Sequence, residues 1–371
     1  MPRTSRNHWY EPQSKLWTPI SDLEDRGIRP LPSQADTQHP CSSSRQSPAG
    51  RRRIHGKNLQ KELKDFFRSH PSRPLIVVLG PTASGKTVFS LQLAHHLKDV
   101  YGVGAEIVNA DSRQIYRELD IGTAKISTEE MQGIPHHLLS VLDPRTECTI
   151  AWFQREALRV IGEIHLRGNM PLLVGGSMLY LSSVIDGYRP LPAADARVRH
   201  RLSRAYDRDG GRLLHERLSR VDPESAASIP RQNKVYLIRA LEIYEQTGRP
   251  KSAQLKRSGC PYDLLIFGLR VEREELKRRI RRRTEQMLRA GWIGEVRSLL
   301  EKGYTMHDPA MISTGYREIL QNLKNGLEQT KVLNKIIVQT CQYAKRQMTW
   351  WKRDARIKWI SSSDLDSPDQ R

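Results

Sequence analysis

The chain has 371 residues, a formal net charge of +20 and a pI of about 10.0. No apolar run approaches the roughly 18 residues that a membrane-spanning helix needs, and no signal-peptide core is visible. The four cysteines, Cys41, Cys148, Cys260 and Cys341, form no Cys-x-x-Cys pair, which argues against a zinc knuckle or a disulfide framework and indicates a reducing cytoplasm.

The excess of basic residues predicts a polyanionic partner, most often nucleic acid. Residues 1–73 carry a net charge of +7, which leaves +13 on the rest of the chain, so the charge is not confined to one end. A generally basic, solubilising surface is the alternative explanation.

Residues 1–73 are predicted to be a disordered basic extension. The part up to about residue 55 is rich in Pro, Ser, Arg and Gln, whereas Lys61–Arg68 has the pattern of a short helix. A transit peptide is one alternative, although Glu11 and Asp22 are unusual in such peptides. A start codon placed too far upstream is another.

The first strong motif is Gly-Pro-Thr-Ala-Ser-Gly-Lys-Thr at residues 80–87. It follows an apolar strand pattern, Leu75–Leu79, and precedes a helical pattern, Val88–Leu97, as a phosphate-binding loop requires. Backbone N–H groups and the helix N-terminus would face the anion, with the Lys86 charge beside them and the Thr87 hydroxyl on a Mg²⁺ ion. A chance Gly/Ser loop is the alternative, and the loop alone does not distinguish ATP, GTP or a pyrophosphate ester. The predicted ligand-binding residues are Gly80, Pro81, Thr82, Ala83, Ser84, Gly85, Lys86 and Thr87.

The second motif begins at Asp111, directly after the strand pattern Ala105–Ala110. In open α/β sheets ligands bind at the carboxyl ends of the strands, so Asp111 is expected to face the same crevice as the phosphate loop. Its side chain could serve as a general base, as a Mg²⁺ partner, or as the cap of a following helix.

Alternating elements continue through the first half of the chain. Thr149–Arg167 is an amphipathic helix pattern with Thr149 as its N-cap, and Met170–Val174 is a buried strand pattern that ends at Gly175-Gly176. That glycine pair predicts a close approach of backbone or ligand. Met178–Ile185 is predicted to be helical, and the alternation predicts a parallel, doubly wound sheet.

The second half predicts a helical insertion followed by a return to the sheet. The expected elements there are the strand Asp263–Val271, a helix Glu272–Ala290 with seven basic residues between Arg273 and Arg283, a long helix Lys331–Trp351 and a last strand Arg356–Ile360. The seven cations suggest a surface that follows phosphates. The predicted fold class is α/β, a P-loop NTPase-like parallel sheet flanked by helices. The predicted domains are the extension 1–73, the first part of the core 74–190, an all-helical insertion 191–262, the second part of the core 263–361 and a polar tail 362–371.

Several short motifs follow one another along the chain: Gly-Pro-Thr-Ala-Ser-Gly-Lys-Thr at 80–87, Asp-Ser-Arg-Gln-Ile-Tyr at 111–116, Asp-Ile-Gly-Thr-Ala-Lys at 120–125, Pro-His-His at 135–137, Gly-Gly-Ser-Met-Leu-Tyr at 175–180, Arg-Ala-Leu-Glu at 239–242, Gly-Tyr-Arg-Glu at 315–318 and Ala-Lys-Arg-Gln-Met-Thr-Trp at 344–350. In these motifs and their order the chain resembles the tRNA dimethylallyltransferase (tRNA isopentenyltransferase) family in its bacterial form, from about residue 74 to residue 360. Such enzymes transfer a dimethylallyl group from its diphosphate to the N6 amine of the adenosine 3′ of the anticodon. The resemblance implies Mg²⁺ as cofactor, and a tRNA anticodon stem-loop and dimethylallyl diphosphate as partners. It also implies a cytoplasmic monomer that does not bind a membrane, and a target base that leaves its stack in the RNA. The resemblance further implies that the insertion 191–262 contacts tRNA.

Residue roles follow from the resemblance and from the chemistry. The adenine amine must lose a proton as it attacks, and Asp111 is assigned as the general base. Thr82, Lys86 and Arg239 are the other implied catalytic residues, and Thr87 is the implied metal ligand. The residues implied in tRNA binding are Asp111, Ser112, Arg113, Gln114, Ser177, Arg199, Val235, Tyr236, Leu237, Ile238, Arg239, Gly315, Tyr316 and Arg317.

The chain departs from the family pattern at three positions. Ser177 stands where Thr is usual and keeps a hydroxyl, Tyr236 stands where Arg is usual, and Thr314 replaces an Ile. The zinc finger of many eukaryotic members is absent. Two rival functions share the phosphate loop: a small-molecule or nucleoside kinase, and a non-catalytic RNA-binding protein.

Overall fold

The computed structural model describes residues 57–187, 191–254, 259–326 and 328–361. The extension up to residue 56 and the predicted polar tail 362–371 lie outside these residues. Within the described residues, no helix is both long and apolar enough to cross a membrane.

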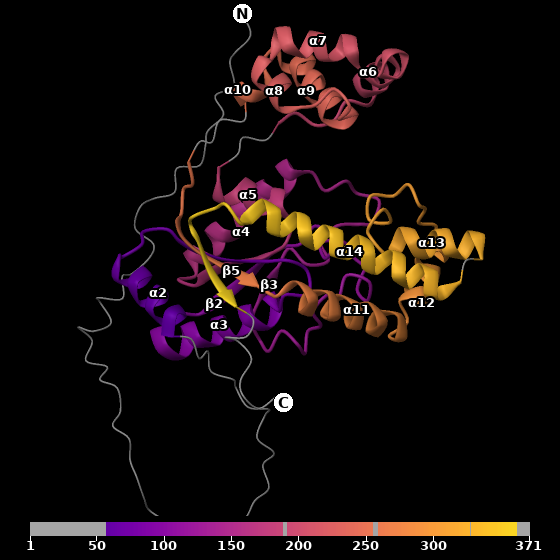
Figure 1. Cartoon of the computed structure of the whole chain (residues 1–371). Helices are drawn as coiled ribbons and strands as arrows, with labels where there is room; N and C mark the ends of the chain where they lie inside the picture. Colours follow the sequence, from indigo (N-terminus) through magenta and orange to yellow (C-terminus); the bar gives the residue numbers. More distant parts are fainter. Residues whose placement is uncertain (1–56, 188–190, 255–258, 327, 362–371) are drawn as a thin grey trace, which may run out of the picture.

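A six-stranded sheet forms the centre of the molecule (Figure 1), and its strand order is β3-β2-β4-β1-β5-β6. Every neighbouring pair of strands is parallel, which confirms the predicted α/β fold. The strands β1, β2 and β4 are buried along their whole length, as expected for a parallel sheet covered on both faces. The strands are β1 (Pro74–Leu79), β2 (Ala105–Ala110), β3 (His136–His137), β4 (Met170–Gly175), β5 (Asp263–Arg270) and β6 (Ile357–Ser361).

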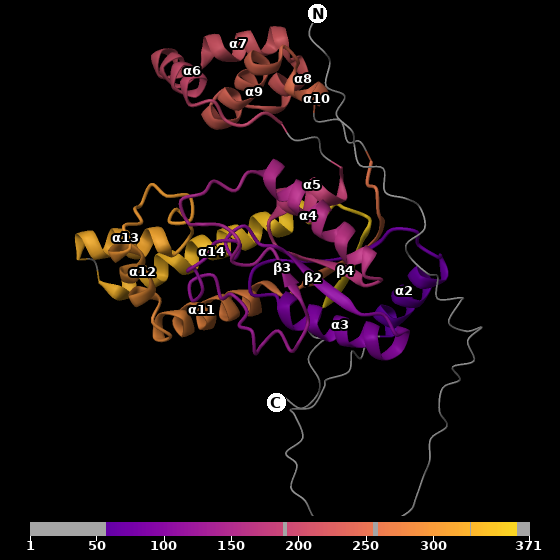
Figure 2. The ribbon, with the colours of Figure 1, turned by 180° about the vertical axis from the view of Figure 1, so that it is seen from behind.

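Two hydrophobic cores lie on opposite faces of the sheet, because successive strand residues point to opposite sides. Ile76 and Val78 of β1 belong to the core that contains α2 and α3, whereas Leu75 and Val77 belong to the core that contains α4 and α5. Figures 1 and 2 show α2 and α3 on one side of the sheet and α4, α5 and α14 on the other. The helices of the core are α2 (Lys57–Arg68), α3 (Lys86–Tyr101), α4 (Ile150–Leu166), α5 (Met178–Ile185), α11 (Arg273–Arg289), α12 (Trp292–Glu301), α13 (Tyr316–Asn325) and α14 (Gln329–Trp351).

Helix α2 corrects the predicted extent of the N-terminal extension. Its apolar residues Leu59, Leu63 and Phe67 are buried against the α3 side of the sheet, so residues 57–73 belong to the core. The spacing of four residues places all three on one face of the helix. The short helix predicted at Lys61–Arg68 covers the C-terminal part of α2.

The segment between the two parts of the core forms a separate bundle of short helices (Figure 2). Its own apolar core includes Leu202, Leu218, Leu237 and Leu241. Asp195, Asp222 and Asn233 cap three of its helices through side-chain oxygens that accept backbone N–H bonds. The helices of this insertion are α6 (Ala196–Asp209), α7 (Arg212–Val221), α8 (Pro223–Ser228), α9 (Lys234–Thr247) and α10 (Lys251–Gln254).

Candidate active site

The phosphate loop connects β1 to α3, as predicted. Ala83 and Gly85 have φ angles of 62° and 90°, left-handed conformations that turn the backbone back on itself. The Lys86 ammonium donates to the carbonyl oxygens of Gly80 at 3.1 Å and Pro81 at 2.8 Å. Burial lowers the pKa of Lys86 to about 8, and the nearby Asp111 carboxylate partly opposes this shift.

Asp111 lies directly after β2, at the same edge of the sheet as the loop. Its Oδ1 accepts the backbone N–H of Arg113 at 2.8 Å, and its own N–H donates to Asn109 Oδ1 at 3.1 Å. The residues that follow form a turn and not a helix, so the helix-capping alternative is wrong. The carboxylate is fixed by the turn and lines both cavities of the site.

Two cavities meet at this edge. The loop cavity, about 470 Å³, is lined by the phosphate loop from Thr82 to Thr87. The helix cavity, about 370 Å³, is lined by α11, α14 and residues 312–316. Each has the volume of a small-ligand pocket. The six residues that line both are Thr82, Ala83, Lys86, Asp111, Thr123 and Arg283.

Arg283 of α11 is the site residue whose position the sequence reasoning missed. The run of cations on its helix predicts a surface position, yet Arg283 lines both cavities and interacts electrostatically with Asp111 and Lys86. Burial lowers its pKa, and the Asp111 carboxylate opposes that shift. The helical spacing indicates this position, because Arg283 lies three residues after the buried Ile280 and therefore on the inner face of the helix.

The other basic residues of α11 are partly neutralised by the helix itself. Glu275 accepts hydrogen bonds from Arg278 and Arg279 at 2.9 Å and 2.8 Å, and Arg281 lies 3.7 Å from Glu285. The face is therefore less positive than a run of seven cations implies.

Helix α14 fastens the phosphate loop to the neighbouring strand end. The side chain of Gln347 accepts the Thr82 N–H at 2.9 Å and donates to the Gly176 carbonyl at 2.7 Å. Gln347 and Trp351, near the end of this helix, are both buried. The predicted close approach at the glycine pair is confirmed, because a Cβ on Gly175 would lie 2.2 Å from the Ala110 carbonyl oxygen.

The predicted tRNA-contacting residues of the core divide between the two cavities and their surroundings. Four of them line the helix cavity, namely Asp111, Ser112, Arg113 and Tyr316, whereas Gln114 lines the loop cavity and Ser177, Gly315 and Arg317 line neither. Ser177 is buried, and its hydroxyl accepts the Ser112 N–H at 2.9 Å. The Arg113 guanidinium donates to Pro309 O and Ser313 Oγ, both at 3.3 Å. The segment 111–114 is thus tied to β4 and to the loop before α13.

The motif Gly315-Tyr316-Arg317 divides between core and surface. Tyr316 is fully buried, and its hydroxyl donates to Glu295 at 2.6 Å. Arg317 is half exposed and pairs with Glu318 at 3.2 Å. Tyr316 therefore shapes the wall of the helix cavity.

The predicted site residues of the insertion do not line either cavity. Leu237 and Ile238 are buried in the core of the insertion, because α9 turns both side chains inward. Val235 and Tyr236 are 75% and 58% exposed. Arg199 and Arg239 both bond to the buried carboxylate of Glu242.

The structure offers few protein ligands for a metal ion. Among the described residues, no group of three or more His, Cys, Asp or Glu side chains is gathered to hold one. Thr87 and Asp111 both line the loop cavity, so a hydroxyl and a carboxylate lie on the same side as the phosphate loop. This donor set suits Mg²⁺, which usually keeps several waters and takes its other ligands from substrate phosphates.

Comparisons with known proteins agree with this arrangement. The model of a family described as IPP transferase matches residues 114–354. A protein named tRNA dimethylallyltransferase from Symbiobacterium thermophilum is 44% identical over 80% of this chain and 91% of its own length, and one from Geobacter sulfurreducens is 41% identical over 77% and 91%.

Two solved structures have a similar fold. A tRNA isopentenylpyrophosphate transferase from Bacillus halodurans has a TM-score of 0.57 and 37% identity, over 78% of this chain and 90% of that one. A eukaryotic dimethylallyltransferase acting on tRNA has a TM-score of 0.68 and 27% identity, over 79% and 75%. The chain therefore belongs to the IPP transferase family, whose relatives are named tRNA dimethylallyltransferases.

Proposed function

We propose that this protein transfers a dimethylallyl group from dimethylallyl diphosphate to the N6 amine of the adenosine on the 3′ side of the anticodon in tRNA. The observation that carries the proposal is the meeting of two cavities at one carboxylate and two cations: Asp111, Lys86 and Arg283. A reaction between a diphosphate ester and a base requires an anion site and a proton acceptor side by side.

Each cavity suits one substrate. The loop cavity contains the backbone amides and helix N-terminus of the phosphate loop, which bind phosphate groups. The helix cavity is bordered by Ser112, Arg113 and Arg346, which suit an RNA strand and its base. The adenosine must leave the stack of the anticodon loop to enter it.

The chemistry needs one bond to break and one to form. The N6 nitrogen attacks C1 of the dimethylallyl group, the C1–O bond breaks, and pyrophosphate leaves. The Asp111 carboxylate takes the N6 proton, because the amine becomes acidic only as it forms the new bond. Lys86, Arg283 and the amides of the loop stabilise the negative charge that develops on the departing pyrophosphate. The implied role of Thr82, a hydrogen bond to a bridging phosphate oxygen, agrees with its position on both cavities.

Mg²⁺ is the proposed cofactor. Thr87 would hold it together with the diphosphate oxygens, and the ion would supply further neutralisation of the leaving group. Arg199, Val235, Tyr236 and Arg239 are proposed tRNA contacts of the insertion, with Arg239 also retained as a catalytic residue on the resemblance. We propose a cytoplasmic monomer.

The test is direct incubation of the protein with unmodified tRNA and dimethylallyl diphosphate, followed by mass analysis of the anticodon-loop adenosine. Transfer is expected without ATP; consumption of ATP without tRNA would instead support the kinase alternative. Asp111→Asn should lower transfer by about 10³-fold with tRNA affinity nearly unchanged, since general-base catalysis contributes 10²- to 10⁴-fold. Transfer close to the wild-type rate in this variant would remove Asp111 as the base.

A further inference from the structure

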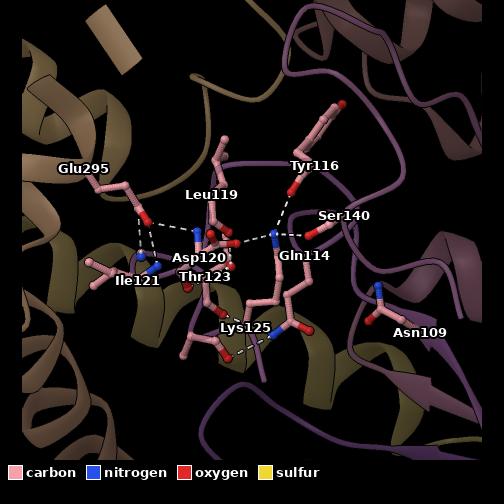
Figure 3. A network of polar contacts seen from close by, with 12 residues as sticks. Asn109, Gln114, Tyr116, Leu119, Asp120, Ile121, Thr123, Lys125, Ser140 and Glu295 are labelled. Atoms are coloured by element: carbon pink, nitrogen blue, oxygen red, sulfur yellow. Dashed lines mark hydrogen bonds and ion pairs between the residues drawn. The ribbon is translucent and has the colours of Figure 1, made fainter. Parts of the chain in front are cut away.

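The segment Leu119–Lys125 approaches the site without taking part in the proposed chemistry. Figure 3 shows that it is held from one side by Glu295 of α12. The carboxylate accepts the backbone N–H groups of Asp120 at 2.9 Å, Ile121 at 2.7 Å and Gly122 at 3.2 Å. Hydrogen bonds to an ionised acceptor are about twice as strong as neutral ones, so this contact fixes three consecutive residues.

Glu295 is itself fixed in place. The buried Tyr316 hydroxyl donates to its Oε1 at 2.6 Å, and burial raises the Tyr316 pKa, so the phenol stays a donor at neutral pH. The rings of Trp292 and Tyr316 pack edge to face beside Gly122, where an added Cβ would lie 1.9 Å from Trp292 Nε1. The backbone at Gly122 can lie beside the Trp292 ring, and so within reach of Glu295, only because glycine has no side chain.

Lys125 holds the other end of the segment. Its side chain is only 7% exposed, and its ammonium donates to Tyr116 O and Asp120 Oδ1, both at 2.7 Å, and to Ser140 Oγ at 2.8 Å (Figure 3). The loop is therefore anchored to α12 at one end and to the chain around β3 at the other.

Between the two anchors lies Thr123, which lines both cavities. Its carbonyl oxygen accepts from Gln114 Nε2 at 3.1 Å and from Arg283 Nη2 at 3.4 Å. The Thr123 carbonyl thus helps to orient the Arg283 guanidinium, which lies beside Asp111 and Lys86.

From these contacts we infer that Glu295 is a positioning residue for the transfer reaction: it fixes the backbone at 120–122 so that the Thr123 carbonyl holds Arg283 toward the pyrophosphate leaving group. The inference rests on the proposed function. It assigns Glu295 no contact with either substrate, so its effect must pass through Arg283.

The test is Glu295→Gln, which keeps the shape of the side chain but has one acceptor oxygen in place of two. We expect kcat to fall about tenfold with the KM for tRNA changed less than twofold, since small misplacements of catalytic groups are costly. Glu301→Gln, an exposed position on the same helix, is the matched control and should leave both constants unchanged. Thermal unfolding of each variant checks folding. If Glu295→Gln does not fold, Tyr316→Phe, which loosens the same carboxylate, should still lower kcat severalfold.

A double-mutant cycle separates positioning from general support. In an Arg283→Lys background, Glu295→Gln should lower kcat by less than about threefold, because the group it positions is already altered. A full tenfold loss in both backgrounds, or no loss in either, would overturn the inference.

Binding of inorganic pyrophosphate, measured by calorimetry, keeps this test independent of transfer. Glu295→Gln should weaken that binding severalfold and Glu301→Gln should not. If pyrophosphate binding differs between the variants in this way but the wild type transfers nothing, the proposed function is wrong. The positioning of Arg283 by Glu295 is then still supported. Equal binding by the wild type and Glu295→Gln refutes the positioning role even if transfer occurs.

Discussion

The cavity edge of the core and the interior of the insertion both contain charged side chains, but these side chains are paired in opposite ways. In the insertion, the fully buried Glu242 is surrounded by donors: Arg199 at 3.0 Å, Arg239 at 2.7 Å and the Asp195 N–H at 2.7 Å. At the cavities, Lys86 and Arg283 bond to backbone carbonyl oxygens, and within the described residues neither has a carboxylate oxygen within 4.0 Å.

This difference separates structural charge from charge that is available to a ligand. Burial works to raise the pKa of Glu242, but the donated hydrogen bonds outweigh it and lower the pKa below its ordinary value. Burial lowers the pKa values of Lys86 and Arg283, with Asp111 opposing. An incoming diphosphate would supply the missing negative charge at the cavities, whereas the insertion is already balanced.

The largest effect is expected at Lys86. Lys86→Met removes the cation from the phosphate loop and should lower transfer by about 10³-fold, at the upper end of the loss from removing one electrostatic donor. Steady-state kinetics with saturating tRNA measure it. The fold should persist, because among the described residues the ammonium bonds only to carbonyl oxygens of its own loop. Wild-type turnover in Lys86→Met would show that this charge is not used.

The second test sets Arg283 against Arg239. Arg283→Met should lower transfer about 10²-fold at unchanged melting temperature. Arg239→Met should lower the melting temperature as well as transfer, since it deprives Glu242 of a partner. Differential scanning calorimetry beside the transfer assay separates the two. Destabilisation by Arg283→Met, and none by Arg239→Met, would contradict the distinction between ligand-binding charge at the cavities and structural charge in the insertion.

A third effect concerns stability alone. Glu242→Gln should destabilise the protein by about 2 kcal/mol, the scale of hydrogen bonds to a charged group. Because the folded pKa of Glu242 is lowered, its contribution is present above the ordinary value of 4.5 and is lost as pH falls through the folded pKa. Denaturation at pH 7 and pH 3 should therefore show a smaller difference between variant and wild type at the lower pH. An equal difference at both would contradict the pairing.

The smallest effect is on ligand binding at high pH. The pKa of Lys86 is about 8, so its ammonium is largely protonated at pH 7 and largely neutral at pH 9. Affinity for pyrophosphate should fall up to about tenfold over that range. In Lys86→Arg the fall should be reduced to the part caused by titration of pyrophosphate itself, since arginine stays charged. Identical pH profiles would exclude Lys86 as the titrating group.

Much of the fold follows from local pattern. The buried strands of Val, Ile and Leu, the loop at 80–87 and the cap at Thr149 have signals that act within a few residues, and the structure places β1, β2, β4 and α4 at or within one residue of the expected bounds. The position of Asp111 also follows from local pattern, because a residue directly after a parallel strand must lie at the ligand-binding edge of the sheet.

What the sequence by itself determined is the order of the elements, the phosphate loop and the acid that faces it. Only the tertiary structure decided which cation of α11 enters the site, that Gln347 fastens the loop, and that Glu295 holds the backbone at 120–122. These contacts join residues more than 150 positions apart, and the direction of a side chain across such a distance depends on how whole helices pack against the sheet. Local patterns determine a helix and its apolar face; the residue that meets a given neighbour is set by packing.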